Sequence, residues 1–294
     1  MTAPLFASPN ACVEFEQRVV TRAIGKHIHF FEQTQSTNDL ALDAARKGGA
    51  HGTVFVADAQ GAGRGRRGRQ WECPPGMGLL FSVLLRPTAI PLEVAGWIPL
   101  VAGLSCAEAL ASLFEKLHSV ALKWPNDLVL PTDAAPGWKK LGGILCESAL
   151  PALSSAIPLN DADRGYAVIG IGLNLIQTRD MLPVTGKAPA SSVRIETDEI
   201  VDRQLVLKTL LERLEINLDQ LSSGTQRSAL RTTIEEKMRA WLPTWKSLLF
   251  HSPPTESANL RRGMFAGLDE YGRIRILEAG GESAYADAEI VGVE

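Results

Sequence analysis

Residues 61–71 read Gly-Ala-Gly-Arg-Gly-Arg-Arg-Gly-Arg-Gln-Trp, with four glycines and four arginines in eleven positions. Glycine allows positive φ angles and lets backbone N–H groups approach a ligand closely. The planar guanidinium group of arginine matches the geometry of phosphate or carboxylate. A hydrophobic core has no use for four arginines among residues 64–69, so we interpret the stretch as a surface loop. Its chemistry suits a di- or triphosphate, or an acyl phosphate.

Three other interpretations of this loop compete with the first. The spacing Gly63-x-Gly65-x-x-Gly68 matches the dinucleotide-binding pattern, but that pattern should open an apolar helix, which residues 69–75 cannot form. A nucleic-acid contact would rest on a short basic run in a chain of net charge −3. A solvated loop is partly compatible with function, because mutual repulsion of the arginines and the entropy of the glycines favour mobility until a ligand orders the loop.

The composition is that of a soluble globular protein, with 294 residues, 45% hydrophobic and 21% charged. This length supports one large domain plus a small one. The four cysteines form no C-x-x-C pair, no signal peptide is recognisable, and no run of 18 uncharged apolar residues occurs. We therefore expect a cytoplasmic protein, and the net charge gives no reason to expect nucleic acid or a membrane as partner.

Apolar periodicity predicts strands that alternate irregularly with helices. Strands are expected at 28–31, 53–57, 79–85, 120–123, 128–130, 140–147 and 166–174. Helices are expected from a capping box at Ser36 and Asp39 to the glycines at 48–49, and near 94–117, 203–221 and 232–241. Loops are expected at 131–138 and 150–164, and a turn at Pro87 and Pro91. The tail contains short strands at 263–268 and 273–277 joined by a hairpin turn at 269–272, which predicts a small all-β module.

Polar residues at the ends of apolar segments are candidates for ligand contact. Ser36-Thr37-Asn38 is either a plain helix N-cap or a set of ligand-binding groups at a helix N-terminus. Lys123 ends an apolar strand and needs an anionic partner, either a buried carboxylate or, as we favour, a ligand phosphate. Gly142-Gly143 lies inside a strand, which suggests the close approach of another backbone or of a ligand.

Five stretches in this order resemble the biotin–protein ligase family, over roughly residues 27–220. They are Ser36-Thr37-Asn38; Gln60 with residues 63–71; Lys123-Trp124-Pro125-Asn126-Asp127-Leu128; residues 140–147; and Gly170-Ile171-Gly172-Leu173-Asn174. The resemblance is to members without the DNA-binding domain, for which the first 24 residues are too short.

The resemblance implies an α+β fold, with a central mixed β-sheet flanked by helices as in class II synthetases and biotin–lipoate ligases. It places an N-terminal extension at 1–24, the catalytic domain at 25–243 and a small SH3-like β domain at 244–294. It also implies that biotin and ATP, with Mg²⁺, give biotinyl-5′-AMP and that a lysine of a biotin carboxyl carrier protein then takes the biotinyl group. A homodimer is left open.

The same resemblance assigns site residues by position. Lys123, Arg64 and Arg66 would be catalytic. Contacts with biotin or its adenylate would come from Ser36, Thr37, Asn38, Gln60, Gly63, Arg64, Gly65, Arg66, Trp71, Lys123, Gly142 and Gly143. The ATP and Mg²⁺ side would hold Asn126, Asp127 and Asn174, with the metal carried by ATP and no dedicated protein site.

Two rival functions remain. Lipoate–protein ligases and octanoyl transferases share this fold and act on carboxylic acids, but are expected to lack the full glycine and arginine run. A biotin-binding regulator without enzymatic activity is the other alternative.

Overall fold

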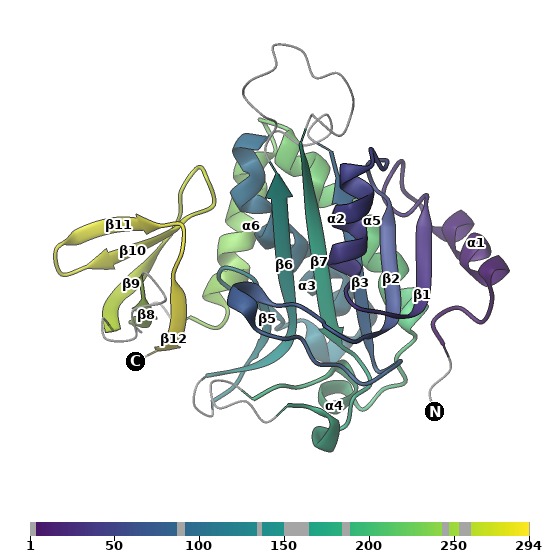
Figure 1. The fold of residues 1–294 in the computed structure, drawn as a ribbon. Coiled ribbons are helices and arrows are strands. Elements are labelled where there is room, and N and C mark those ends of the chain that lie inside the picture. The colour runs from purple at the N-terminus through teal and green to yellow at the C-terminus, as the bar shows by residue number, and fades with distance from the viewer. Residues whose placement is uncertain are drawn as a thin grey trace, which may run out of the picture.

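The computed structural model describes residues 4–86, 92–133, 137–149, 165–183, 189–242, 247–252 and 260–293. It contains a seven-stranded sheet flanked by helices and a separate five-stranded sheet near the C-terminus (Figure 1). This arrangement confirms the predicted fold class. The turn predicted at Pro87 and Pro91 lies outside the described residues, as do the loop at 150–164 and the centre of the loop at 131–138.

The large sheet is mixed and runs in the order β1-β2-β3-β7-β6-β5-β4. The pair β1 and β2 is parallel, and the other neighbouring pairs are antiparallel. Its strands are Ile28–Thr34 (β1), Val54–Gln60 (β2), Gly78–Leu85 (β3), Ala121–Lys123 (β4), Asp127–Pro131 (β5), Trp138–Ala149 (β6) and Tyr166–Asn174 (β7). The central strands β3 and β7 are buried almost throughout, which explains their unbroken apolar sequence.

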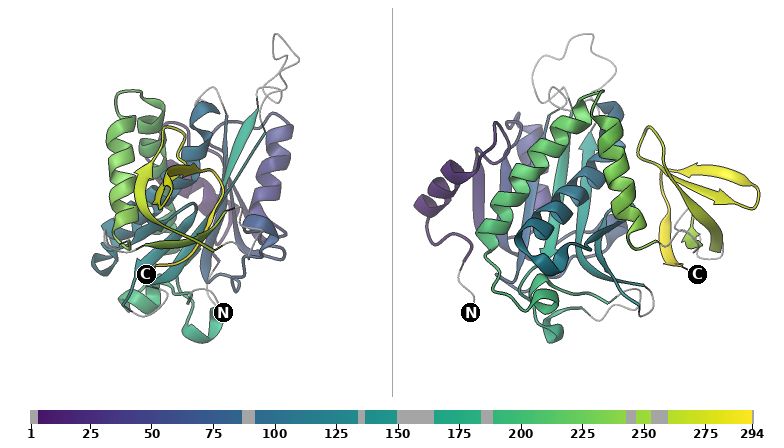
Figure 2. Two further views of the ribbon diagram at one scale, coloured as in Figure 1. Left: turned by 90° about the vertical axis from the view of Figure 1, so that its left-hand side faces the viewer. Right: turned by 180° about the vertical axis from the view of Figure 1, so that it is seen from behind.

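Helices cover both faces of this sheet (Figure 2). On one face, α2 (Thr37–Arg46) buries Ala41 and Ala45 against Leu84 and Val168. On the other face lie α3 (Ile98–Leu113), α5 (Arg203–Ser222) and α6 (Arg227–Arg239), which build the main core. A stripe of leucines along α5 packs into this core; it consists of Leu207, Leu210, Leu211, Leu214, Leu218 and Leu221. Shorter elements are α4 (Val193–Thr197) and the 3₁₀ turns Arg66–Gly68 (η1), Leu92–Trp97 (η2), Glu115–Leu117 (η3) and Arg179–Met181 (η4).

The starts of α3 and α6 differ from the sequence predictions, and the N-terminus of α2 differs in one contact. Helix α6 begins at Arg227, not near residue 232. The apolar helix α3 begins at Ile98, not near residue 94, because η2 precedes it; Pro99 then falls in the first turn, where its missing N–H costs nothing. At α2, Ser36 is the N-cap residue, but its side chain makes no capping hydrogen bond, so the predicted capping box is wrong. The backbone N–H of Thr37 instead donates to Oε1 of Gln60 at 2.7 Å.

The residues before β1 are packed onto the large sheet. Helix α1 (Pro9–Arg18) buries Phe15, which is 1% exposed and stacks edge-on against Phe6. The backbone N–H of Leu5 donates to the carboxylate of Asp58 at 3.0 Å, and the same carboxylate pairs with Arg203 of α5 at 2.6 Å. This segment therefore contributes to the core of the large domain.

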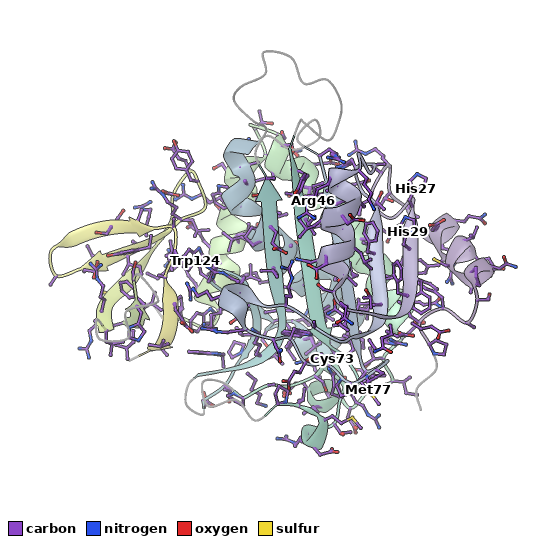
Figure 3. The ribbon with its side chains drawn as sticks, in the orientation of Figure 1. His27, His29, Arg46, Cys73, Met77 and Trp124 are labelled. Carbon is purple, nitrogen blue, oxygen red and sulfur yellow. The ribbon has the colours of Figure 1, made fainter. Side chains whose placement is uncertain are left out.

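The C-terminal module is an antiparallel sheet in the order β11-β10-β9-β8-β12. Its strands are Leu248–His251 (β8), Leu260–Leu268 (β9), Ile274–Glu278 (β10), Gly281–Tyr285 (β11) and Glu289–Val293 (β12). The predicted hairpin turn between β9 and β10 is confirmed, and it docks on the large domain. Trp97 and Trp124 donate their indole N–H groups to the carbonyls of Glu270 and Gly272, at 2.8 and 3.3 Å; Figure 3 shows Trp124 at this junction.

One stretch, Val94–Leu113, is long and apolar enough to cross a membrane by length and composition alone. Its apolar window is 72% buried inside the protein, where α3 contacts α5 and strands of the large sheet. Such burial is typical of the core helix of a globular domain.

Replacing Phe15 by alanine should lower the free energy of unfolding by about 3–5 kcal/mol, because a buried aromatic ring is lost from a packed core. Val13 of the same helix is 51% exposed, and Val13→Ala should change stability by less than about 0.5 kcal/mol. Denaturant unfolding measures both. Equal effects would show that α1 adds nothing to the core.

Candidate active site

A cavity of about 690 Å³ opens on the large sheet beside the C-terminal module. Its walls come from the N-terminus of α2, the glycine and arginine loop, the β4–β5 turn, the middle of β6 and β7, and the start of β12. Thirteen of the predicted site residues line it: Ser36, Thr37, Asn38, Gln60, Arg64, Gly65, Arg66, Trp71, Lys123, Asn126, Asp127, Gly143 and Asn174. Segments far apart in the sequence thus meet around one volume.

The other two predicted residues, Gly63 and Gly142, do not belong to this lining. A Cβ atom on Gly63 would lie 2.3 Å from the carbonyl oxygen of Trp71, across the base of the loop. A Cβ on Gly142 would lie 2.6 Å from Leu173 in the neighbouring strand. Both glycines therefore permit close packing within the protein. They support the walls of the cavity without lining it.

The first turn of α2 is held by a polar network under the cavity. Oε1 of Gln60 accepts from the backbone N–H of Thr37, and the Thr37 hydroxyl lies 3.1 Å from it. The side-chain amide of Asn38 donates to Glu147 at 2.9 Å and accepts from the hydroxyl of Ser82 at 2.6 Å. These contacts fix which polar atoms α2 presents to a ligand.

Sequence reasoning missed Ser82 and Glu147. Ser82 is fully buried in the apolar strand β3, and a hydroxyl in such a strand is the signal that could have been followed. Gly170, opposite on β7, is explained by the same network, because a Cβ there would lie 2.0 Å from Oδ1 of Asn38.

Each arginine of the loop is paired with carboxylates from elsewhere in the chain. Arg64 contacts Asp39 at 3.1 Å and also Glu147. The C-terminal module supplies the other partners: Asp287 pairs with Arg66 and Arg67, and Glu289 pairs with Arg67 and Arg69. The repulsion among arginines expected from the sequence is therefore offset within the protein.

Backbone geometry also distinguishes this loop from a dinucleotide-binding loop. Arg67 has φ 56° and Gly68 has φ 69°, both in the left-handed region. Residues 69–77 then run without a helix into strand β3. The dinucleotide-binding interpretation is wrong, because that motif requires a helix directly after its last glycine.

Arg66 lies partly inside the cavity wall. Burial lowers the pKa of its guanidinium from the ordinary value, the charge of Arg67 lowers it further, and Asp287 acts in the opposite direction. A bound anion would therefore stabilise the charged form of the partly buried Arg66 guanidinium.

Two lysines share the carboxylate of Asp127. Lys123 is 10% exposed, lies 3.7 Å from Asp127, and sits over the ring of Trp138. Lys140 is 32% exposed and pairs with Asp127 at 2.6 Å. Burial lowers the pKa of Lys123, and the negative charge of Asp127 opposes that shift. Burial raises the pKa of the Asp127 carboxyl group, but the two lysines outweigh burial and hold this pKa below its ordinary value.

Lys140 is a second lysine in the cavity, which the sequence analysis did not assign to the site. Strict alternation along β6 would place Lys140 and Gly143 on opposite faces, since they are three residues apart. The β5–β6 register shifts at this point, so that Leu128 pairs with Gly142 but Val129 pairs with Lys140. As a result, Nζ of Lys140 lies 3.4 Å from the Cβ position of Gly143. A lysine two residues before the glycine pair was the available signal.

The indole ring of Trp71 lies between the arginine loop and the large sheet. Cβ atoms on Gly143 and Gly172 would lie 3.3 and 2.6 Å from its ring, and Nζ of Lys140 lies 5.6 Å from the ring centroid. The indole nitrogen is buried and has no hydrogen-bond partner in the part of the chain that the structure describes. An aromatic ring and a cation thus form one wall of the cavity.

The residues predicted for the ATP side are anchored in the sheet. The amide of Asn126 donates to the carbonyl of Ile144 at 2.7 Å, and Oδ1 of Asn174 accepts from Gln177 at 3.0 Å. Within the described residues, no group of three His, Cys, Asp or Glu side chains could hold a metal ion.

The fold and cavity define a protein with a cavity on a mixed sheet whose arginine and lysine side chains suit an anionic small molecule. A model of the biotin/lipoate A/B protein ligase family matches residues 30–158. Biotin–[acetyl-CoA-carboxylase] ligase of Paracoccus denitrificans is 32% identical over 263 residues, which cover 88% of this chain and 97% of that one. The same-named protein of Mycobacterium tuberculosis is 30% identical over 263 residues, 87% of this chain and 85% of that one.

A solved structure of biotin protein ligase from Aquifex aeolicus in complex with biotin and ATP superimposes with a TM-score of 0.68. It is 28% identical and covers 92% of this chain and 98% of that chain. The chain therefore belongs to the biotin/lipoate A/B protein ligase family.

Replacing Asp287 by asparagine should speed trypsin cleavage at residues 64–69 several-fold in the ligand-free protein, because two arginines lose a charged partner. Glu282→Gln is the control, since it breaks an ion pair with Arg275 inside the C-terminal module. Its cleavage rate at the loop should match that of the wild type. Equal cleavage in all three proteins would mean that the carboxylate does not restrain the loop.

Proposed function

We propose that this chain is an ATP-dependent biotin–protein ligase, which forms biotinyl-5′-AMP and transfers the biotinyl group to a lysine of a biotin carboxyl carrier protein. The relatives of Paracoccus denitrificans and Mycobacterium tuberculosis are named biotin–[acetyl-CoA-carboxylase] ligases, and the Aquifex aeolicus biotin protein ligase structure is a complex with biotin and ATP. The observation that carries the proposal is a single cavity lined by the N-terminus of α2, the arginine loop and Lys140.

The first reaction joins two anions, so the site must supply positive charge. An oxygen of the biotin carboxylate attacks the α-phosphorus of ATP, and pyrophosphate leaves with the electrons of the broken P–O bond. Arg64 and Arg66 in the loop and Lys140 on β6 line the cavity, where they would stabilise the charge that develops on the phosphate oxygens. Lys123 is more buried than Lys140, pairs with the same Asp127 carboxylate, and would contribute positive charge as well.

Mg²⁺ would arrive with the triphosphate of ATP as part of the substrate. Asp127 is the acidic residue best suited to contact Mg²⁺, but its carboxylate is already neutralised by Lys140 and Lys123. Asn126, Asp127 and Asn174 would border the nucleotide, where the two asparagine amides are suited to hydrogen bonds with the ribose or base.

The second reaction needs no covalent nucleophile on this chain. The neutral amine of the carrier lysine attacks the carbonyl carbon of the mixed anhydride, and AMP leaves with the electrons of the broken C–O bond. The nitrogen then loses one proton to solvent as the amide bond forms. Water would compete for the same carbon, so the loop has to keep the adenylate covered. The carrier domain would therefore approach the open side of the cavity. We also propose that the protein acts in the cytoplasm.

The decisive assay incubates the purified protein with ATP, Mg²⁺ and one of two acceptors, a biotin carboxyl carrier domain with radiolabelled biotin or a lipoyl domain with radiolabelled lipoate, in parallel tubes. Labelling of the carrier with biotin, dependent on ATP, is the expected result. Lipoate labelling of a lipoyl domain instead would identify a lipoate ligase. Biotin binding without pyrophosphate release would indicate a regulator.

Lys140→Ala should lower the rate of pyrophosphate release by about 10²-fold or more, because a cation that acts on the reacting phosphate is lost. Lys123→Ala should lower the rate by about 10²-fold or more as well, because its ammonium group is 10% exposed and a cation in such a water-poor place acts strongly on the reacting phosphate. A near-wild-type rate for Lys140→Ala would remove it from the reaction, and the same outcome for Lys123→Ala would remove Lys123.

Arg66→Gly should weaken retention of the adenylate more than binding of ATP, since the guanidinium group belongs to the loop that covers the cavity. Freed biotinyl-5′-AMP would then label lysines of bystander proteins. The measurement is biotin incorporated into added albumin, compared with the wild type at equal pyrophosphate release. No gain in albumin labelling would contradict the covering role of the loop.

A further inference from the structure

Glu147 on β6 touches two elements of the candidate site without lining the cavity itself. Its Oε2 atom accepts a hydrogen bond from the side-chain amide of Asn38 at 2.9 Å, and the same oxygen accepts from the guanidinium of Arg64. Asn38 belongs to the first turn of α2, and Arg64 to the arginine loop. One carboxylate oxygen therefore joins the floor of the cavity to its cover.

The orientation of the Asn38 amide depends on this contact. Both hydrogens of its Nδ2 group are used, one toward Glu147 and one toward the carbonyl of Leu145 at 3.3 Å. Its Oδ1 accepts from Ser82 and keeps one lone pair for another donor. Without a carboxylate at position 147, the Asn38 side-chain amide could flip. Its NH₂ group would then face the ligand as a donor, in place of the acceptor Oδ1.

The position of the Arg64 guanidinium depends on the same carboxylate. Arg64 is also paired with Asp39, but the Asp39 side chain is 53% exposed, whereas that of Glu147 is 29% exposed. An ion pair with the less exposed partner is less screened by solvent and holds its geometry better. Glu147 is thus the main internal anchor of this arginine.

We propose that Glu147 is a positioning residue of the ligase reaction, which couples the biotin-side orientation of Asn38 to the closure of the arginine loop through Arg64. The proposal rests on the proposed function. Glu147 reaches the substrate only through these two residues, so its loss should affect biotin and its adenylate and leave the nucleotide contacts in place.

The test compares wild type, Glu147→Gln and Asp39→Asn, all as full-length protein. Glu147→Gln removes the charge at nearly constant volume, and Asp39→Asn removes the other carboxylate of Arg64 without touching the Asn38 side chain. For Glu147→Gln we expect the KM for biotin and the rate of adenylate release each to rise about tenfold, the effect expected from losing one charge-assisted hydrogen bond. The KM for ATP should stay within about twofold, whereas kcat for pyrophosphate release should fall, because Arg64 would stabilise the charge that develops on the reacting phosphate.

Asp39→Asn should leave the KM for biotin within about twofold of the wild-type value. A double-mutant cycle between Glu147→Gln and Asn38→Ala should be strongly non-additive, since both changes break the same contact. Thermal unfolding checks that each variant is folded.

Two outcomes would overturn the proposal. A biotin KM and an adenylate release rate within twofold of the wild type in Glu147→Gln would reduce Glu147 to a surface ion pair. A parallel loss of biotin affinity, ATP affinity and thermal stability would indicate a structural role alone. The wild-type arm separates these results from failure of the proposed function, because a wild type that forms neither pyrophosphate nor labelled carrier refutes the ligase activity and the positioning role with it.

Discussion

The constraint on which this structure depends is the placement of four arginines within six residues beside a cavity. Like charges so close together require neutralising partners, or the loop would be driven into solvent. The chain supplies carboxylates from three places: the first turn of α2, strand β6, and the segment that runs from Asp287 into the start of β12. Because β12 belongs to the C-terminal module, the loop ties the two sheets together at the site.

A second constraint is space above the large sheet. Trp71 follows the loop and lies against β6 and β7, where side chains on Gly143 and Gly172 would collide with its ring. Gly170 leaves room for the amide of Asn38 in the same way. The glycines at alternate positions of β7 therefore follow from what the loop and α2 bring onto that face, and a sheet packed only for stability would carry larger side chains there.

Much of this fold could be predicted from the sequence because its signals are local. The apolar run of β3, the leucine stripe of α5 and the turn between β9 and β10 each lie within about twenty consecutive residues. The carboxylate partners of the arginines could not be predicted, since Asp287 is more than two hundred residues from the loop. Lys140 was missed for a different reason: a register shift in β6 broke the alternation on which face assignment relies.

The paired arginines also determine how a phosphate can enter. Arg66 already has a carboxylate partner, so an incoming phosphate must exchange with Asp287 and does not meet a bare cation. That exchange is inexpensive because the Asp287 side chain is 57% exposed and regains water when it is released. Glu289, at 14% exposed, would lose more by separating from Arg69 and is suited to remain in place. The C-terminal module thus offers one partner that can leave easily and one that holds the base of the loop.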